Sequence, residues 1–312
     1  MTAQPPIGGQ ASVPAVPRDT GVVARFAPSP TGRLHLGHAA SAIRAHDLAR
    51  AAGGRFLLRI EDIDGTRSRA AHVDEIFEDM SWLGLAWDGP VWRQSERLDV
   101  YAQALDRLRG MGLLYPCFCT RAAIEREVAA SASAPHAGEG EPVYPGTCRR
   151  LTGAERAARM DEPHGWRLDM AAALAVATRS GAALAWHDAS RGWVAEDPAS
   201  FGDVVLARKD APASYHLAVT LDDAGQEVTD VVRGVDLFAA THVHRLLQAL
   251  FGLPVPRYHH HLLLQGPDGQ RLAKRNGAPT LAAMRAAGAD GREIAGMLRQ
   301  GNLPAGFGVA MD

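Results

Sequence analysis

The sequence of this 312-residue chain predicts an α/β fold with a doubly wound parallel sheet that is interrupted by an inserted segment. Two observations carry this prediction. A strand, a helix and a second strand follow one another between residues 22 and 60, and a segment of different composition separates this unit from later strand patterns. Two parallel strands need a helical crossover of this kind, so the first unit is read as β-α-β.

Hydrophobic periodicity gives the elements in order. Residues 22–26 form a short apolar strand, 39–52 a helix and 55–60 a second buried strand. Glu61, Asp62 and Asp64 follow that strand directly and therefore lie at the edge of the sheet where α/β proteins bind ligands. Residues 73–83 and 98–111 read as amphipathic helices, and strand-like residues 202–208 and 228–233 should return to the same sheet.

The chain is expected to have five parts. They are a disordered tail at 1–20, the first half of the main domain at 21–115, an inserted domain at 116–185, the second half of the main domain at 186–260, and a loop with a short helical segment at 261–312. The tail is rich in proline and glycine, and residues 131–142 of the insertion are small, polar and turn-forming, so we expect a mobile loop there.

Composition limits the classes of function. The chain is 46% apolar with a net charge of −2, which argues against a uniformly basic nucleic-acid-binding surface, so RNA would have to meet a local patch of arginines. No apolar run approaches the roughly 20 residues needed to cross a bilayer, and the start lacks the pattern of a secretory signal. We therefore expect a cytoplasmic enzyme with no membrane partner.

Two distant segments indicate a nucleotide site. His35 and His38 lie on one side of a predicted helix start, where backbone N–H groups favour a phosphate, and Gly37 permits close approach of a ligand. Of the 33 basic residues only Lys209 and Lys274 are lysines. A lysine kept in so arginine-rich a chain suits a moving phosphate, because its compact ammonium sits on a flexible stem.

These residues resemble the signatures of a known family. His-Leu-Gly-His at 35–38 and Arg-Leu-Ala-Lys-Arg at 271–275 resemble the HIGH and KMSKS signatures of class I aminoacyl-tRNA synthetases. Six further motifs resemble the glutamyl-tRNA synthetases in the same order, at 25–32, 58–64, 82–88, 94–97, 214–218 and 231–237. The resemblance implies a Rossmann-like catalytic domain with an inserted α/β domain that contains zinc.

The length of the chain separates two groups within this family. Only 38 residues follow Lys274, whereas a separate anticodon-reading domain needs about 100. The chain therefore resembles the short glutamyl-queuosine tRNA(Asp) synthetases, whose acceptor is the queuosine base in the anticodon of tRNA(Asp). A truncated glutamyl-tRNA synthetase that charges tRNA(Glu) and a non-catalytic sensor of glutamate or its adenylate remain the alternatives.

The resemblance implies a reaction and its nucleotide-binding residues. The chain would activate L-glutamate with ATP and Mg²⁺ to glutamyl-adenylate without needing tRNA, and would then transfer the glutamate to RNA. His35, His38 and Lys274 are the implied catalytic residues, and with Gly37 they would bind ATP. Ala273 and Arg275 depart from the KMSKS pattern by replacing hydroxyl residues. Lys274 keeps the charge that the pyrophosphate would need.

The amino-acid pocket can be argued from charge. Glutamate carries two carboxylates and one ammonium group, so its pocket needs cationic forks and an anion. By resemblance, Arg25 and Ser29 contact the amino acid, Glu61 binds its ammonium group, and Tyr215 and Arg233 surround its carboxylates. Asp230 departs from the histidine found in many relatives, a difference with no physical explanation from the sequence. The expected oligomeric state is a monomer.

The three cysteines suggest a zinc site in the inserted segment. Cys117, Cys119 and Cys148 supply three sulfurs, and a tetrahedral zinc needs a fourth donor. Buried reduced thiols are the alternative on spacing alone. The resemblance implies that Tyr144 is the fourth ligand and that one structural Zn²⁺ is bound, whereas His136, in the expected mobile loop, is the weaker candidate.

Overall fold

The computed structural model describes residues 21–125, 143–195, 197–266, 272, 279–303 and 307–309. Several sequence predictions fall outside these residues. They are the disordered tail at 1–20, the mobile loop at 131–142 with His136, and the segment with Ala273, Lys274 and Arg275.

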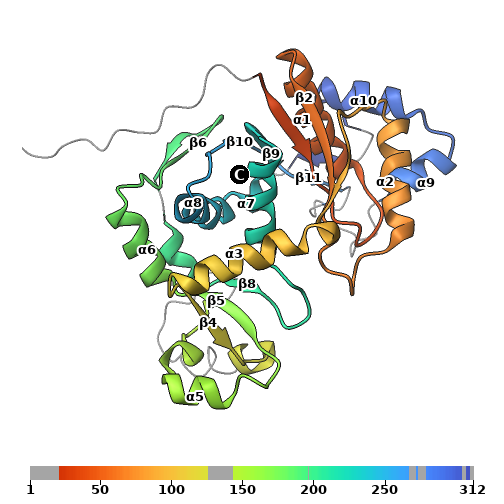
Figure 1. Ribbon diagram of the computed structural model, residues 1–312. Coiled ribbons are helices and arrows are strands. Elements are labelled where there is room, and N and C mark those ends of the chain that lie inside the picture. The colour runs from red at the N-terminus through yellow and green to blue at the C-terminus, as the bar shows by residue number, and fades with distance from the viewer. Residues whose placement is uncertain are drawn as a thin grey trace, which may run out of the picture.

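Seven strands form the main sheet in the order β3-β2-β1-β9-β10-β6-β7 (Figure 1). They are β1 (Val23–Phe26), β2 (Arg55–Ile60), β3 (Trp92–Arg93), β6 (Trp186–Asp188), β7 (Gly192–Val194), β9 (Asp230–Gly234) and β10 (Arg257–His261). All neighbours pair in parallel except β6 and β7, which form an antiparallel hairpin at one edge. The predicted α/β fold with a parallel sheet is confirmed, and β1 lies beside β9 despite their distance in sequence.

The described helices cover both faces of this sheet, except the short helix at Gly153–Ala158, which belongs to a separate lobe. They are α1 (Leu36–Ala51), α2 (Ala70–Trp82), α3 (Leu98–Gly110), α5 (Gly153–Ala158), α6 (Met170–Arg179), α7 (Tyr215–Gly225), α8 (Ala240–Phe251), α9 (Leu281–Ala286) and α10 (Gly291–Arg299). Helices α1, α2, α9 and α10 share one hydrophobic core, and α3, α6, α7 and α8 share another. Among the helices that the structure describes, none has the length and hydropathy to cross a membrane.

Strand alternation decides which side chains reach which face. On β1, Ala24 and Phe26 pack in the core that contains α1, while Arg25 points to the opposite face and meets α7. On β9, Val232 joins the first core and Arg233 points toward α8. Successive strand residues face opposite sides, so each of these two central strands contributes one arginine to the same face.

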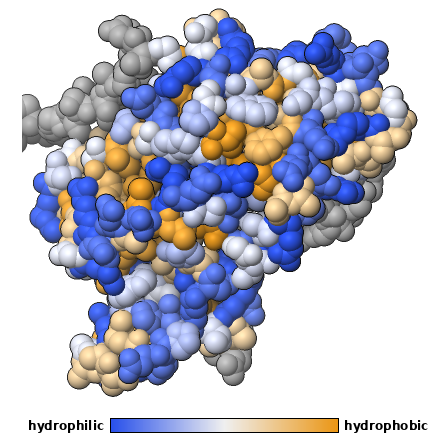
Figure 2. Space-filling view, turned by 45° about the vertical axis from the view of Figure 1, so that its right-hand side comes forward, coloured by the Kyte–Doolittle hydropathy of each residue, from blue (hydrophilic) through white to orange (hydrophobic). Residues whose placement is uncertain are grey.

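Three shorter strands form a second sheet in the order β4-β5-β8, and they are β4 (Leu114–Cys117), β5 (Gly165–Leu168) and β8 (Val205–Ala207). With α5 they build a lobe that projects from the main body (Figure 1, Figure 2). The prediction that residues 202–208 return to the main sheet is wrong. Strand β8 pairs antiparallel with β5, because Leu206 packs beside Leu168 in the core under the small sheet.

The remaining elements are short. Strands β11 (Leu264–Gln265) and β12 (Gly308–Val309) pair antiparallel, and 3₁₀ turns occur at Gln94–Glu96, Thr147–Arg150, Pro198–Phe201 and Val235–Leu237. The inserted domain is predicted to end at residue 185, but strand β8, which follows that residue in sequence, pairs with β5 of the small sheet. The domain boundaries given by the sequence stay a prediction.

Candidate active site

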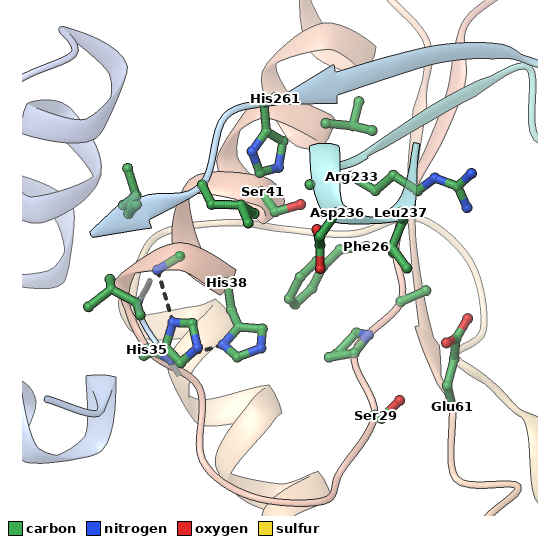
Figure 3. Close-up of a pocket in the computed structure, with 18 of the residues that line it drawn as sticks. Phe26, Ser29, His35, His38, Ser41, Glu61, Arg233, Asp236, Leu237 and His261 are labelled. Atoms are coloured by element: carbon green, nitrogen blue, oxygen red, sulfur yellow. Dashed lines mark hydrogen bonds between the residues drawn. The ribbon is translucent and has the colours of Figure 1, made fainter. Parts of the chain in front are cut away.

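A cavity of about 390 Å³ lies at the carboxyl ends of β1, β2, β9 and β10 (Figure 3). These strands are neighbours in the sheet, so the residues that follow them meet at one edge. Eight residues singled out from the sequence line this cavity, and they are Arg25, Ser29, His35, Gly37, His38, Glu61, Tyr215 and Arg233. Figure 3 shows the two histidines on one side and Glu61 with Arg233 on the other. Their individual roles stay predictions.

The histidine side of the cavity is the capped start of α1. His35 has an extended backbone and precedes the helix, and its Nδ1 atom accepts a hydrogen bond from the Gly37 N–H at 3.1 Å. The His35 N–H donates to Nδ1 of His38 at 3.2 Å, and the two ring centroids are 3.9 Å apart. The rings thus satisfy two backbone N–H groups at this helix start, where the sequence predicts a phosphate. Both rings are fixed against the helix by this capping.

The segment that carries Lys274 is attached to the cavity at both ends. Leu272 lines the cavity and its N–H donates to the Leu264 carbonyl at 2.9 Å. Thr280 forms an antiparallel bridge with His35, and the next N–H, of Leu281, donates to the carbonyl just before His35, that of Leu34, at 2.9 Å. Lys274 itself lies outside the described residues, between Leu272, which lines the cavity, and Thr280, which pairs with His35.

Arg25 enters the cavity already paired with an acidic residue. Its Nε and Nη2 atoms donate to the two carboxylate oxygens of Asp223 on α7, at 2.9 and 3.3 Å, and Nη1 donates to the Val232 carbonyl at 3.4 Å. Burial alone would raise the pKa of Asp223, but the charges of Arg25 and Arg59 outweigh it and lower the pKa. Arg25 is therefore a neutralised cation whose orientation is set by α7.

Glu61 is held in place by a second buried arginine. Arg59, on β2, is fully buried and its Nη2 atom lies 3.2 Å from Oε1 of Glu61 and 2.8 Å from Oδ1 of Asp223. Its Nη1 atom donates to the Gln226 side chain at 2.8 Å. Burial raises the pKa of Glu61, and the charges of Arg59 and Arg25 oppose that rise. The ammonium group of a bound amino acid would stabilise the charged form of Glu61 further.

Arg233 differs from these two arginines because its contacts are neutral. It is 5% exposed, and its guanidinium donates to Tyr215 Oη at 3.2 Å, His244 Nδ1 at 3.3 Å, Thr241 Oγ1 at 2.5 Å and His260 Nε2 at 3.1 Å. Within the described part of the chain, no carboxylate forms a salt bridge with it. A buried cation without a counterion favours an incoming carboxylate.

The two imidazoles beside Arg233 carry no positive charge near neutral pH. Burial, followed by the charge of Arg233, lowers the pKa of His260 to about 4. The same two causes, in the same order, lower the pKa of His244 well below its usual value, and its Nε2 atom lies 3.1 Å from Nδ1 of His216. Both rings therefore act as neutral acceptors for Arg233.

Four residues of the site were not found from the sequence, namely Arg59, Asp223, His244 and His260. A signal for two of them exists. Arg59 interrupts the apolar strand at 55–60 and Asp223 lies in the mainly apolar helical run of α7, and a charged residue in an apolar pattern is costly to bury without a partner. Nothing in the sequence alone states that these two charges pair with each other.

The predicted zinc ligands come together in the inserted lobe. The sulfur atoms of Cys117, Cys119 and Cys148 lie within 4.8 Å of one another, with Cys119 and Cys148 3.5 Å apart. The Tyr144 hydroxyl lies 3.5 Å from Cys117 Sγ and 3.6 Å from Cys119 Sγ. The guanidinium of Arg167 donates to Cys117 Sγ at 3.3 Å, which suits a deprotonated thiolate. The cluster could hold a metal ion.

Comparison with known proteins identifies similar sequences across most of the chain. The family model for the catalytic domain of class I tRNA synthetases (E and Q) matches residues 21–299. The chain is 49% identical over 278 residues to the Glutamyl-Q tRNA(Asp) synthetase of Rhodobacter capsulatus, covering 88% of this chain and 98% of that protein. It is 47% identical over 284 residues to the Glutamyl-Q tRNA(Asp) synthetase of Symbiobacterium thermophilum, covering 88% and 84%.

Solved structures of longer enzymes share the fold. A glutamate tRNA ligase from Elizabethkingia meningosepticum, in complex with its amino acid, superposes with a TM-score of 0.72 at 27% identity. The glutamate-tRNA synthetase of Elizabethkingia anophelis superposes with a TM-score of 0.73 at 26% identity. The match covers 89% of this chain in both cases, and 60% and 61% of the two solved chains.

Proposed function

The chain belongs to the class I tRNA synthetase family, in the group of the Glutamyl-Q tRNA(Asp) synthetases, and from this premise we propose that it activates L-glutamate with ATP and transfers it to the queuosine base of tRNA(Asp). One observation carries the proposal beyond the family match. The cavity at the strand ends combines a carboxylate, the capped start of α1 and a buried arginine for which the described residues provide no counterion. Such a cavity can hold an acidic amino acid next to a nucleotide.

The reaction has two steps. An oxygen of the α-carboxylate of glutamate attacks the α-phosphorus of ATP, the bond from that phosphorus to the bridging oxygen breaks, and pyrophosphate leaves with the electron pair. A hydroxyl of the cyclopentene diol of queuosine then attacks the activated carbonyl, loses its proton, and AMP leaves. Neither step needs a covalent intermediate with the protein, so catalysis rests on positioning and on stabilisation of charge.

The amino-acid half of the cavity would orient glutamate through its three charges. Arg233, with Tyr215 at 3.2 Å from its Nη1 atom, would bind a carboxylate. Glu61 would bind the ammonium group, while Arg25 and Ser29 would contact the remainder of the amino acid. Because Arg25 is already neutralised by Asp223, Arg233 supplies most of the net charge that selects an acidic side chain.

The other half would hold ATP with its Mg²⁺. His35 and His38 would contact the phosphates and ribose, and Gly37 lies between them in the cavity lining, where a side chain would meet the His35 ring. We assign Lys274 the role of neutralising the charge that grows on the pyrophosphate. Support comes from the two anchors of its segment, Leu272 at the cavity and Thr280 against His35.

The RNA acceptor is tested by offering radiolabelled glutamate with three RNAs in parallel. We expect label on queuosine-containing tRNA(Asp) and none on queuosine-free tRNA(Asp) or tRNA(Glu), because the modified base supplies the attacking hydroxyl and single-stranded loops can present a base to a pocket. Label on the terminal adenosine of tRNA(Glu), with none on queuosine-containing tRNA(Asp), would instead identify the chain as a truncated glutamyl-tRNA synthetase. We propose that the reaction takes place in the cytoplasm.

One structural Zn²⁺ per chain is proposed for Cys117, Cys119, Tyr144 and Cys148. The donors fit, because the three sulfurs lie within 4.8 Å of one another, the Tyr144 hydroxyl lies 3.5 and 3.6 Å from two of them, and the charge of Arg167 offsets negative charge. The three cysteines form no disulfide bond. Zinc would therefore provide the crosslink between the chain at the end of β4 and the turn at Thr147–Arg150.

Metal analysis of protein purified without added zinc should give about one zinc per chain, and Cys119→Ser should lower that content and the melting temperature. Losing one of four ligands weakens binding, and binding free energy at a structural site is folding free energy. Cys119→Ser should change glutamate-dependent exchange of pyrophosphate into ATP much less than it changes metal content, since Cys119 is absent from the cavity lining. Well-folded native protein without metal would contradict the site and favour buried thiols.

A further inference from the structure

We propose that Asp188 and His260 are positioning residues that orient Arg233 toward the carboxylate of the substrate, through a hydrogen-bonded relay that crosses three strands. The relay runs from Asp188 at the end of β6, through His260 on β10, to Arg233 on β9. It rests on the proposed function, because the carboxylate that it serves is that of the bound amino acid. Neither Asp188 nor His260 lines the cavity.

The relay consists of two short contacts in a buried environment. Nδ1 of His260 lies 2.7 Å from Oδ2 of Asp188, and Nε of Arg233 donates to Nε2 of His260 at 3.1 Å. The side chains of His260 and Asp188 are 1% and 0% exposed. His260 lies directly opposite Arg233 in the parallel pairing of β10 with β9, so the sheet itself fixes the distance between them.

The direction of each hydrogen bond follows from the chemistry of the groups. A guanidinium N–H can only donate, so Nε2 of His260 must be the acceptor and must carry no proton. The proton of the neutral ring is then on Nδ1, where it is donated to the carboxylate of Asp188. Asp188 therefore selects the tautomer that can hold Arg233.

The carboxylate is in turn fixed by the hairpin between β6 and β7. Its other oxygen, Oδ1, accepts from the Ser190 N–H at 2.9 Å, the Ser190 hydroxyl at 2.6 Å and the Arg191 N–H at 3.1 Å. Three donors converge on Oδ1, so only Oδ2 is turned toward His260. An amide at position 188 would keep its oxygen with these three donors. Its NH₂ group would then face the imidazole and the His260 N–H, which donates to Oδ2 at 3.4 Å.

Because the two carboxylate oxygens of Asp188 have different partners, Asp188→Asn is a specific test of the relay. The NH₂ group would meet Nδ1 of His260, which would have to accept, so the ring proton would move to Nε2 and face the N–H of Arg233. The orienting hydrogen bond would be lost. We expect the KM for glutamate in pyrophosphate exchange to rise roughly 10- to 100-fold, as for a buried charged donor that loses its acceptor. The KM for ATP should change less than about twofold.

The chain provides a matched control in Asp230→Asn. Asp230 is 1% exposed and accepts from Nε2 of His259, the residue before His260 on β10, at 2.7 Å. This is also a carboxylate–imidazole pair, although His259 is 24% exposed and Asp230 forms an ion pair with Arg257 at 3.1 Å. His259 forms no hydrogen bond with Arg233 and is absent from the lining of the active-site cavity. Asp230→Asn should lower stability without a selective change in the KM for glutamate.

A pair of variants at position 260 tests the acceptor separately. In His260→Gln the amide oxygen can reach the place of Nε2 and accept from Arg233, whereas in His260→Asn the shorter side chain can reach only the place of Nδ1. Both variants remove the ring, including its contacts with Trp186 and Phe238. We expect His260→Gln to keep a KM for glutamate several-fold lower than that of His260→Asn, although their melting temperatures fall by similar amounts.

The outcomes separate this relay from the proposed function. Wild-type protein without glutamate-dependent exchange would overturn the proposed function, and the relay with it. With active wild-type protein, a KM for glutamate in folded Asp188→Asn that equals that of Asp230→Asn would overturn the relay alone. If Asp188→Asn does not fold, equal KM values for His260→Gln and His260→Asn would overturn it.

Discussion

Lys274→Ala is expected to lower the rate of glutamate-dependent exchange of pyrophosphate into ATP by about 10² to 10³-fold, measured without RNA. Removal of one preorganised charge at a developing anion costs roughly 3 to 4 kcal/mol in the transition state. The loss should appear mainly in kcat, because the charge on the pyrophosphate grows as the bond to the α-phosphorus breaks. The binding of glutamate should change little, since Glu61 and Arg233 lie across the cavity from His35 and His38, the residues proposed to bind ATP (Figure 3).

The only other lysine of the chain provides the control. Lys209 lies on the inserted lobe, where its Nζ atom donates to the Phe118 carbonyl at 2.9 Å, and it does not line the cavity. Lys209→Ala removes the same charge and the same side chain from the protein. An exchange rate for Lys274→Ala that matches that of Lys209→Ala would exclude the proposed role of Lys274 at the pyrophosphate.

Arg233→Met is expected to lower kcat/KM for glutamate by roughly 10² to 10³-fold in the same assay, as for a buried charge pair that loses one partner. Arg233 has only neutral contacts among the described side chains, so its loss leaves the substrate carboxylate without its main counterion. Methionine keeps the aliphatic length of the side chain and limits the cavity that the substitution creates.

Arg245→Met is the matched control for Arg233→Met. Arg245 is also a buried arginine, 4% exposed, and its Nε atom donates to the Ala185 carbonyl at 3.2 Å away from the cavity lining. Its loss should reduce the melting temperature but leave the KM for glutamate near that of the wild type. A similar KM for both variants would show that Arg233 acts on stability and not on the substrate.

Much of the site could be predicted from the sequence because its signals are local. His35, Gly37 and His38 stand within four residues at a helix start, and Glu61 directly follows a buried strand. Such positions depend on hydrophobic period and on capping, which neighbouring residues determine. The resemblance to the synthetases added Tyr144 to the three cysteines, and the structure brings these four side chains together.

The same local signals did not predict which strands pair with each other. Residues 205–207 have the apolar composition of a buried strand, and the sequence placed them in the main sheet. They pair instead with β5, because an apolar pattern determines that a strand is buried but not which strand it pairs with. The strands β6, β7 and β10 were not found from the sequence, and the first and last of them carry Asp188 and His260.

The sequence by itself determined the first β-α-β unit, the helix start at His35 and His38 and the residue types that line the cavity. Only the tertiary structure decided how those charges are paired. Arg25 and Arg233 are equivalent in the sequence as arginines of buried strands, yet α7 places Asp223 against the first, while β10 and α8 surround the second with neutral groups. Partners about 200 residues apart in sequence meet through the order of the strands, which hydrophobic periodicity does not encode.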